Sequence, residues 1–266
     1  MKTENDLQYI GVFDSGVGGL TVLHRALEIL PYEHFLYYAD AANVPYGSKS
    51  SPEILALVEA GVNDMMKYPL KALLLACNSA TSVAAESLRK KYDIPIIGME
   101  PAVKPAILNG DPRRILVLAT DLTLRESKFK DLVRTLDITE SVDALPLQDL
   151  VDFAEEFDFD SPRLQRYLRS SFSKIKWNEY HSVVLGCTHF LYFNLMFSKF
   201  IPSHIKYIDG HDGTIKNLSN AIDHNTFGTS SNIKCMLSGI DVAREVIDPY
   251  LNVLNNDRKI SFRLID

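Results

Sequence analysis

Short apolar runs alternate with longer amphipathic segments along this chain, and this alternation limits the folds that it can adopt. The run at residues 9–13 predicts a strand, and the segment 20–30 after it has helical spacing. Further strands are predicted at residues 35–39, 72–76, 114–119 and 182–186, and a further helix at 80–91. Strands that alternate with helices form βα units with a mostly parallel sheet. We therefore predict an α/β fold in which mostly parallel sheets are flanked by helices.

Two cysteines end two of these strands in matching contexts. The segments 74–79 and 184–189, which contain Cys77 and Cys187, both read apolar, apolar, small, Cys, polar, polar. The cysteines are 110 residues apart (187 minus 77), close to the 105 residues (115 minus 10) between Ile10 and Ile115, which begin comparable strands. This predicts an internal duplication that builds two pseudosymmetric lobes, each with a thiol at a strand end. Cys235 has apolar residues after it, and we assign it to packing.

Composition excludes several classes of protein. The 266 residues carry a net charge of −6 and no long basic block, so a nucleic-acid surface is not expected. The N-terminus has no secretory pattern, and the apolar runs are too short to cross a membrane. Three cysteines without a CxxC motif are typical of reduced thiols in the cytoplasm.

Ligands of open α/β sheets bind beyond the carboxyl ends of the strands, where both cysteines fall. Two thiols on opposite sides of an amino acid can remove the α-proton from one face and return a proton to the other. Cys77 precedes a helix predicted from Ala80, whose N-terminus is expected to lower the pKa of the thiol. Asp14 and His189 are the candidates to shuttle protons to the thiols. Such a site needs no pyridoxal phosphate or other cofactor if it stabilises the developing charge itself.

Other interpretations of these motifs remain open. The turn at residues 14–19 suggests a dinucleotide fingerprint, but Thr21 stands where its third glycine belongs. Cys187 and His189 are only weak evidence for a zinc site, because the sequence offers no second pair of ligands to match them. A Cys–His hydrolase leaves Cys77 unexplained. A two-lobed binding module without catalysis gives no reason for thiols on both sides.

Four motifs together resemble the glutamate racemase family of the aspartate/glutamate racemase superfamily. They are Gly-Val-Phe-Asp-Ser-Gly-Val-Gly-Gly-Leu at 11–20, Val-Pro-Tyr-Gly at 44–47, Ala-Cys-Asn-Ser at 76–79 and Leu-Gly-Cys-Thr-His-Phe at 185–190. The resemblance implies an isomerase that interconverts L- and D-glutamate in a cleft between two lobes, without cofactor or metal, and supplies D-glutamate for peptidoglycan. Residues 1–99 with 210–266 are expected to form the first lobe and 100–209 the second. A homodimer is expected because dimers are usual in the family, and related racemases act on aspartate or other small acids.

The resemblance also implies roles for individual residues. Cys77 and Cys187 match the catalytic pair, with Cys77 acting on D-glutamate and Cys187 on L-glutamate, and Asp14 and His189 assist proton transfer. The residues that match the family's substrate contacts are Asp14, Ser15, Tyr46, Gly47, Asn78, Ser79, Thr188 and His189.

The chain departs from the family pattern in four places. Ser79 replaces the usual threonine, Asn43 replaces a common arginine, and Leu191-Tyr192 replaces a common Pro-Leu. The usual Phe-Val-Pro-Leu-Val-Glu segment reads Gln-Asp-Leu-Val-Asp-Phe at 148–153, so only Asp152 or Glu155 is available to replace the acidic residue that helps the second cysteine in the family.

Overall fold

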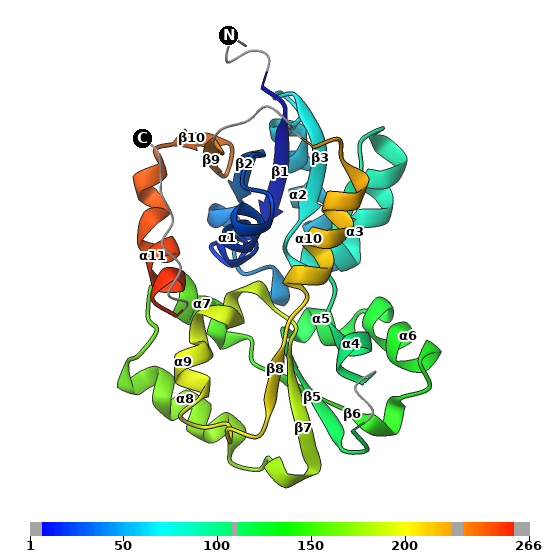
Figure 1. Ribbon diagram of the computed structural model, residues 1–266, viewed down its shortest axis with the longest axis vertical. Coiled ribbons are helices and arrows are strands. Elements are labelled where there is room, and N and C mark those ends of the chain that lie inside the picture. Colours follow the sequence, from blue (N-terminus) through cyan, green and yellow to red (C-terminus); the bar gives the residue numbers. More distant parts are fainter. Residues whose placement is uncertain (1–6, 108–110, 225–230, 258–266) are drawn as a thin grey trace.

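The computed structural model describes residues 7–107, 111–224 and 231–257, which build two sheets one above the other (Figure 1). The first sheet has the order β10-β9-β2-β1-β3-β4, and the second has the order β6-β5-β7-β8. Every neighbouring pair is parallel except β9 with β10. The strands of the first sheet are β1 (Tyr9–Asp14), β2 (His34–Ala39), β3 (Leu70–Leu75), β4 (Ile96–Gly98), β9 (Ile233–Leu237) and β10 (Ile240–Val242). Those of the second are β5 (Arg114–Ala119), β6 (Val142–Pro146), β7 (Tyr180–Leu185) and β8 (Lys206–Ile208).

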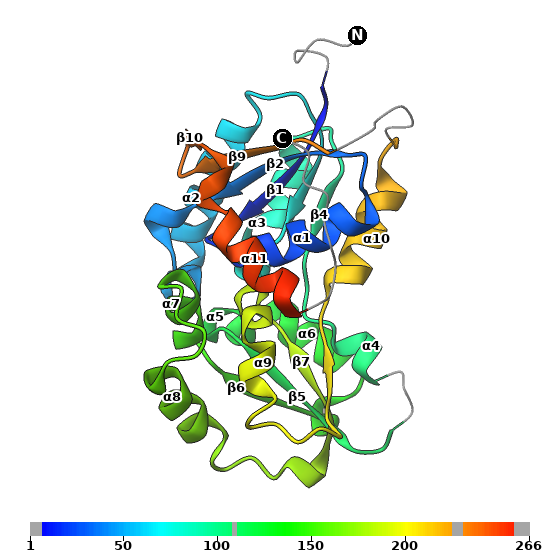
Figure 2. The ribbon, with the colours of Figure 1, turned by 60° about the vertical axis from the view of Figure 1, so that its left-hand side comes forward.

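Helices flank both sheets, as the two views in Figures 1 and 2 show, so the predicted α/β class is confirmed. The α-helices are α1 (Gly19–Ile29), α2 (Ser51–Met65), α3 (Asn78–Lys91), α4 (Val103–Ile107), α5 (Asp121–Arg125), α6 (Ser127–Thr135), α7 (Asp149–Glu155), α8 (Pro162–Phe172), α9 (Asn194–Phe197), α10 (His211–Ala221) and α11 (Asp248–Asp257). The 3₁₀ helices are η2 (Ala41–Asn43), η3 (Tyr46–Ser48), η4 (Thr139–Ser141), η5 (Trp177–Glu179), η6 (Thr188–Phe193) and η7 (Arg244–Val246).

The same four-strand arrangement occurs in both sheets. The order β2-β1-β3-β4 repeats as β6-β5-β7-β8, and each last strand has three residues. The register of β1 with β3 shifts between Tyr9 and Ile10, and the register of β5 with β7 shifts between Arg114 and Ile115. The structure therefore has the repeated plan that the two cysteine segments predicted. The boundaries of the two lobes, at residues 99/100 and 209/210, stay a prediction.

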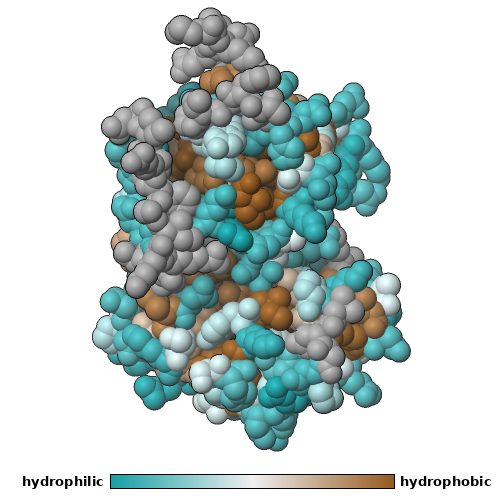
Figure 3. Space-filling model, viewed as in Figure 1, coloured by the Kyte–Doolittle hydropathy of each residue, from teal (hydrophilic) through white to brown (hydrophobic). Residues whose placement is uncertain are grey.

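The strands owe their continuous apolar composition to burial on both faces, as is usual for parallel sheets covered by helices. Every residue of β1 and of β7 is buried. The largest hydrophobic cluster contains Ile10 of the first sheet, Leu116 of the second and Phe190 of η6, so the two halves share one core. Cys235 lies buried in this core, in agreement with its assignment to packing. On the outside, hydrophilic side chains cover most of the face in Figure 3, with apolar areas between them.

Among the described residues, no helix combines the length and the apolar character needed to cross a membrane.

Candidate active site

Cys77 lies two residues beyond β3 and is the N-cap of α3. Its Sγ accepts a hydrogen bond of 3.4 Å from the Ala80 amide, and Ser15 Oγ lies 3.7 Å from the same sulfur. The helix begins at Asn78, two residues earlier than predicted. Cys77 thus stands at the positive end of a helix, as the sequence indicated.

Burial affects the pKa of Cys77 more strongly than the helix N-terminus does. Desolvation raises the pKa of the Cys77 thiol to about 12, with a smaller contribution from the negative charge of Asp14. The hydrogen bonds from Ala80 and Ser15 lower the pKa, but by less. The expectation that the helix N-terminus lowers the pKa of Cys77 is therefore wrong. Burying a thiolate away from water destabilises it by more than the helix N-terminus stabilises it. The raised pKa favours the neutral thiol of Cys77.

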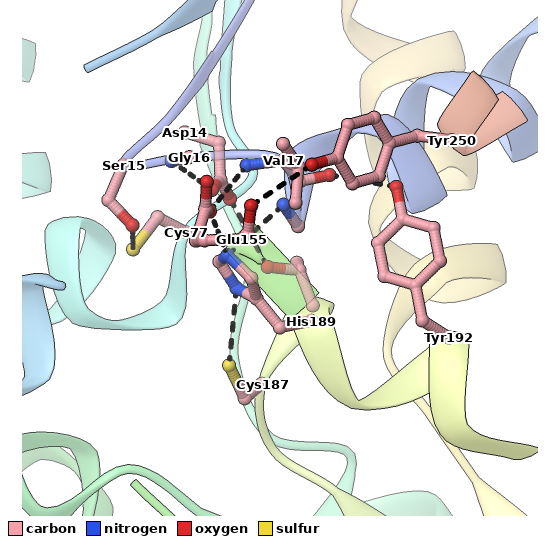
Figure 4. A network of polar contacts seen from close by, with 12 residues as sticks. Asp14, Ser15, Gly16, Val17, Cys77, Glu155, Cys187, His189, Tyr192 and Tyr250 are labelled. Carbon is pink, nitrogen blue, oxygen red and sulfur yellow. Dashed lines mark hydrogen bonds and ion pairs between the residues drawn. The ribbon is translucent and has the colours of Figure 1, made fainter. Parts of the chain in front are cut away.

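Cys187 lies two residues beyond β7, the position that Cys77 occupies beyond β3. The 3₁₀ helix η6 follows it, and no side-chain cap bond forms. Instead, His189 Nδ1 lies 3.7 Å from the Cys187 sulfur (Figure 4). The two thiols therefore occupy equivalent places but have different polar partners.

Glu155, at the end of α7, is the acidic partner of His189. Its Oε1 lies 2.7 Å from His189 Nε2 and accepts a hydrogen bond of 2.8 Å from the Val17 amide. Burial, the largest influence, lowers the pKa of His189, but the bonds to Cys187 and Glu155 together raise it well above its usual value. The raised pKa favours an imidazolium, in which both ring nitrogens of His189 donate to these partners. The Gly18 amide also points at Nε2, at 3.3 Å, but a nitrogen that donates to a carboxylate cannot accept there, so the shorter contact decides.

The glycines of the turn at residues 14–19 make room for this pair. A Cβ at Gly16 would lie 1.8 Å from Glu155 Oε1, and one at Gly18 would lie 2.3 Å from His189 Nδ1. Glycine is needed where a backbone approaches another group this closely. The glycines of this turn are thus explained by the close approach of Glu155 and His189, and a dinucleotide is not needed to account for them.

Asp14, at the end of β1, is completely buried behind the thiols. Its Oδ1 accepts from the Gly16 amide at 2.9 Å, and its Oδ2 accepts from Thr188 Oγ1 at 3.2 Å. Desolvation raises the pKa of Asp14 to about 6, although the nearby charge of His189 lowers it. Its carboxylate joins the first strand of one half to the residue after Cys187 in the other.

A small cavity lies between the two strand ends. It is lined by Ser15, Tyr46, Gly47, Cys77, Asn78, Ser79, Thr120, Thr123, Val151, Cys187, Thr188 and His189. Its volume of about 10 Å³ holds about one water molecule. Asn78 Oδ1 is buried without a hydrogen-bond partner in the described part of the chain. A buried acceptor of this kind is costly unless a ligand satisfies it.

All the predicted site residues meet here, and all but Asp14 line the cavity. Tyr46 is held by a 2.7 Å hydrogen bond from its hydroxyl to Asp40. Sequence reasoning did not single out Thr123 and Val151, which reach the cavity from α5 and α7. It left Asp152 and Glu155 as alternatives, and only Glu155 contacts His189, while Asp152 is exposed.

Comparison with known proteins identifies the family of this arrangement. The model of the Asp/Glu/hydantoin racemase family matches residues 25–215. The chain is 49% identical over 222 residues to a glutamate racemase of Halothermothrix orenii, covering 84% of this chain and 88% of that one.

This chain belongs to the Asp/Glu/hydantoin racemase family. It is also 44% identical to glutamate racemase 2 of Bacillus subtilis, over 91% of this chain and 93% of that one. Among solved structures, the glutamate racemase of Escherichia coli, in complex with L-glutamate and an activator, has a TM-score of 0.77 and 29% identity, covering 92% of this chain and 94% of that one. The protein is thus an amino-acid racemase, an isomerase.

Residues 7–107, 111–224 and 231–257 contain no group of three or more His, Cys, Asp or Glu side chains that could hold a metal ion.

Proposed function

We propose that this racemase interconverts L- and D-glutamate, with Cys77 and Cys187 acting on opposite faces of the α-carbon. One observation carries the proposal: the two thiols line one cavity from equivalent strand ends, and only Cys187 has a histidine beside it, with His189 Nδ1 at 3.7 Å from its sulfur. Burial raises the pKa of Cys77, and the bonds of His189 raise the pKa of that imidazole. A two-base reaction requires such a difference between its two thiols. The relatives that share 44% to 49% of the sequence are glutamate racemases, which supports glutamate as the substrate.

The reaction begins with the thiolate of Cys187 beside protonated His189. The thiolate takes the α-proton of L-glutamate, and the electron pair of the broken C–H bond remains on the α-carbon and its carboxylate. Cys77 then donates its thiol proton to the opposite face. The products are D-glutamate, a Cys187 thiol and a Cys77 thiolate, so the reverse reaction starts from the opposite protonation state. General acid–base pairs of this kind contribute about 10² to 10⁴ in rate for each group.

Glu155 supports the second thiol. Its carboxylate stabilises the imidazolium of His189, whose Nδ1 lies 3.7 Å from the Cys187 sulfur and can exchange a proton with it. Asp14 has the corresponding place near Cys77, where its negative charge disfavours a second anion and keeps the thiol protonated. Asp152 has no part in this proposal, since its side chain is exposed.

Polar groups around the cavity suit the charged groups of an amino acid. The unpartnered Asn78 Oδ1 accepts from the substrate ammonium, and the hydroxyls of Ser15 and Ser79 donate to its carboxylates. The cavity holds about one water molecule, which is too little for glutamate, so we expect the two halves to separate when it enters and to close around it afterwards. Closure then removes water from the thiols, which strengthens every electrostatic interaction in the site.

The metabolic role follows from the product. D-glutamate made in this way would supply peptidoglycan synthesis, and we expect the enzyme to act in the cytoplasm, as a homodimer and without a cofactor.

Circular dichroism of purified protein with each glutamate enantiomer tests the proposal. Both signals should decay to zero without added pyridoxal phosphate or metal. Aspartate and other small acids, run in parallel, should react much more slowly. If neither glutamate enantiomer loses its signal, or if aspartate reacts faster, glutamate is not the substrate.

A further inference from the structure

Thr21, in the first turn of α1, contacts three groups at once. Its Oγ1 lies 2.8 Å from the Gly18 carbonyl oxygen, 3.3 Å from the Thr188 carbonyl oxygen and 2.9 Å from His211 Nε2. Thr188 directly follows Cys187, and His211 begins α10. This threonine, which breaks the dinucleotide fingerprint in the sequence, therefore links the glycine turn to the loop that carries the second thiol.

His211 is fixed on its other side by Asp209. Its Nδ1 lies 2.9 Å from Asp209 Oδ1, and its backbone amide donates to the same oxygen at 2.9 Å. Both His211 and Thr21 have only 4% of their surface exposed. A continuous chain of contacts thus runs from Asp209, just beyond β8, through His211 and Thr21 to the backbone of Thr188.

Counting hydrogens defines the direction of each bond in this chain. The hydroxyl of Thr21 has one proton, which it can give to a carbonyl oxygen or to His211 Nε2. Donation toward Gly18 and Thr188 requires that His211 Nε2 carries a hydrogen and donates to the Thr21 oxygen. Thr21 Oγ1 lies closer to the Gly18 carbonyl oxygen, at 2.8 Å, than to the Thr188 carbonyl oxygen, at 3.3 Å, so the two carbonyls share one proton and the branch to Thr188 is the longer one.

The charged neighbours of His211 are engaged elsewhere. Arg25, on α1, forms ion pairs with Asp212 at 2.6 Å and with Glu28. His24 Nε2 lies 2.9 Å from Asn255 Oδ1. His24, Arg25, Asp212 and His211 line a cavity of about 160 Å³, which is large enough for several water molecules.

We propose that His211 and Thr21 are positioning residues for the racemisation. They hold the Thr188 carbonyl, and with it the Cys187–His189 loop, against the first half of the molecule. Neither residue lines the small cavity between the thiols, so they act through Thr188 alone. The catalytic consequence rests on the proposed function, whereas the positioning of the Cys187 loop does not.

The test compares Thr21→Val, which keeps the shape and loses the hydroxyl, with Thr21→Ser, which keeps the hydroxyl. The valine variant should lose about tenfold in kcat/KM, the effect of about one buried hydrogen bond, and the serine variant should recover most of it. The ratio of kcat/KM for L-glutamate to that for D-glutamate equals the equilibrium constant, which is one for a racemisation. The loss of kcat/KM must therefore be equal for the two enantiomers. His211→Phe should lose a similar factor, and the double variant Thr21→Val with His211→Phe should be no worse than either single variant, since all three break the same chain.

Alkylation of the thiols by iodoacetamide, followed by mass spectrometry, provides a second readout. Cys187 should react several-fold faster in Thr21→Val than in the wild type or Thr21→Ser, while Cys77 reacts at one rate in all three. A serine variant as impaired as the valine variant, additive losses in the double variant, or an unchanged Cys187 rate would overturn the proposal. Wild-type protein that fails to racemise glutamate refutes the proposed function instead, and the alkylation rates still decide the positioning role.

Discussion

The two strand ends that carry the thiols have the same framework but a different chemistry. Each cysteine lies two residues beyond the third strand of a repeated four-strand unit. After Cys77 the chain forms an α-helix of 14 residues, and the Ala80 amide donates to the sulfur. After Cys187 it forms a 3₁₀ helix, which brings His189 and, through it, Glu155 to the sulfur. The repeat fixes where the thiols lie, and the residues that follow each strand determine which polar groups contact each sulfur.

Removing either thiol should cause the largest loss of racemisation. We expect Cys77→Ala and Cys187→Ala each to lower racemisation by about 10³-fold or more, because each general acid or base contributes about 10² to 10⁴. Circular dichroism with both glutamate enantiomers measures the loss. Cys235→Ala is the matched control, since this buried cysteine lies in β9 away from the cavity and should leave the rate within about twofold. Full activity in either active-site variant would contradict the assignment.

Replacing Glu155 should affect the environment of Cys187 and leave that of Cys77 unchanged. Glu155→Gln removes the charge that raises the pKa of His189 but keeps the shape, and we expect kcat/KM to fall about 10- to 100-fold. The pH profile should also move, because His189 then loses its proton at a lower pH. Asp152→Asn, three residues away and exposed, should change kcat/KM less than about twofold. Equal losses in the two variants would show that Glu155 has no special role.

Replacing Asp14 should have a smaller effect, which can be measured as a change in the free energy of unfolding with pH. Its folded pKa of about 6 lies above the ordinary value of 3.8, so the folded state binds more protons between these values. This contribution stabilises the protein at low pH and is lost as pH rises through about 6. Asp14→Asn removes the buried charge, so its free energy of unfolding relative to wild type should improve by about 1 kcal/mol from pH 5 to pH 8. Urea unfolding at both pH values measures the difference, and an unchanged difference would mean that Asp14 is not destabilised by burial.

The fold class and the central strands could be predicted because these strands are continuous apolar runs. The strands at 9–13, 35–39, 72–76, 114–119 and 182–186 all exist, with ends that differ by up to two residues. The strands β4, β6, β8, β9 and β10 were not predicted. Three of them, β4, β8 and β10, have only three residues, which is too short a pattern for periodicity to detect, and β6 and β9 have five. Their pairing comes from neighbouring strands that the sequence does not position.

The site was predictable where motifs follow strands directly. Cys77, Cys187 and His189 could be found in this way, but Glu155 could not be chosen over Asp152 from sequence. The choice depends on which face of α7 points at the glycine turn, and that depends on how the two halves pack. The pKa of Cys77 was also out of reach, because the helix end is visible in the sequence and the depth of burial is not.

Hydrogen exchange at the α-carbon in deuterium oxide, measured by proton NMR on the two single-thiol variants, tests the central claim most directly. Each variant retains one base and cannot complete a racemisation. With Cys77→Ala, the remaining Cys187 should exchange the α-proton of L-glutamate and leave D-glutamate unchanged. With Cys187→Ala, the remaining Cys77 should exchange only D-glutamate. Exchange of both enantiomers by one variant, or of the same enantiomer by both, would contradict a mechanism in which the two thiols work on opposite faces.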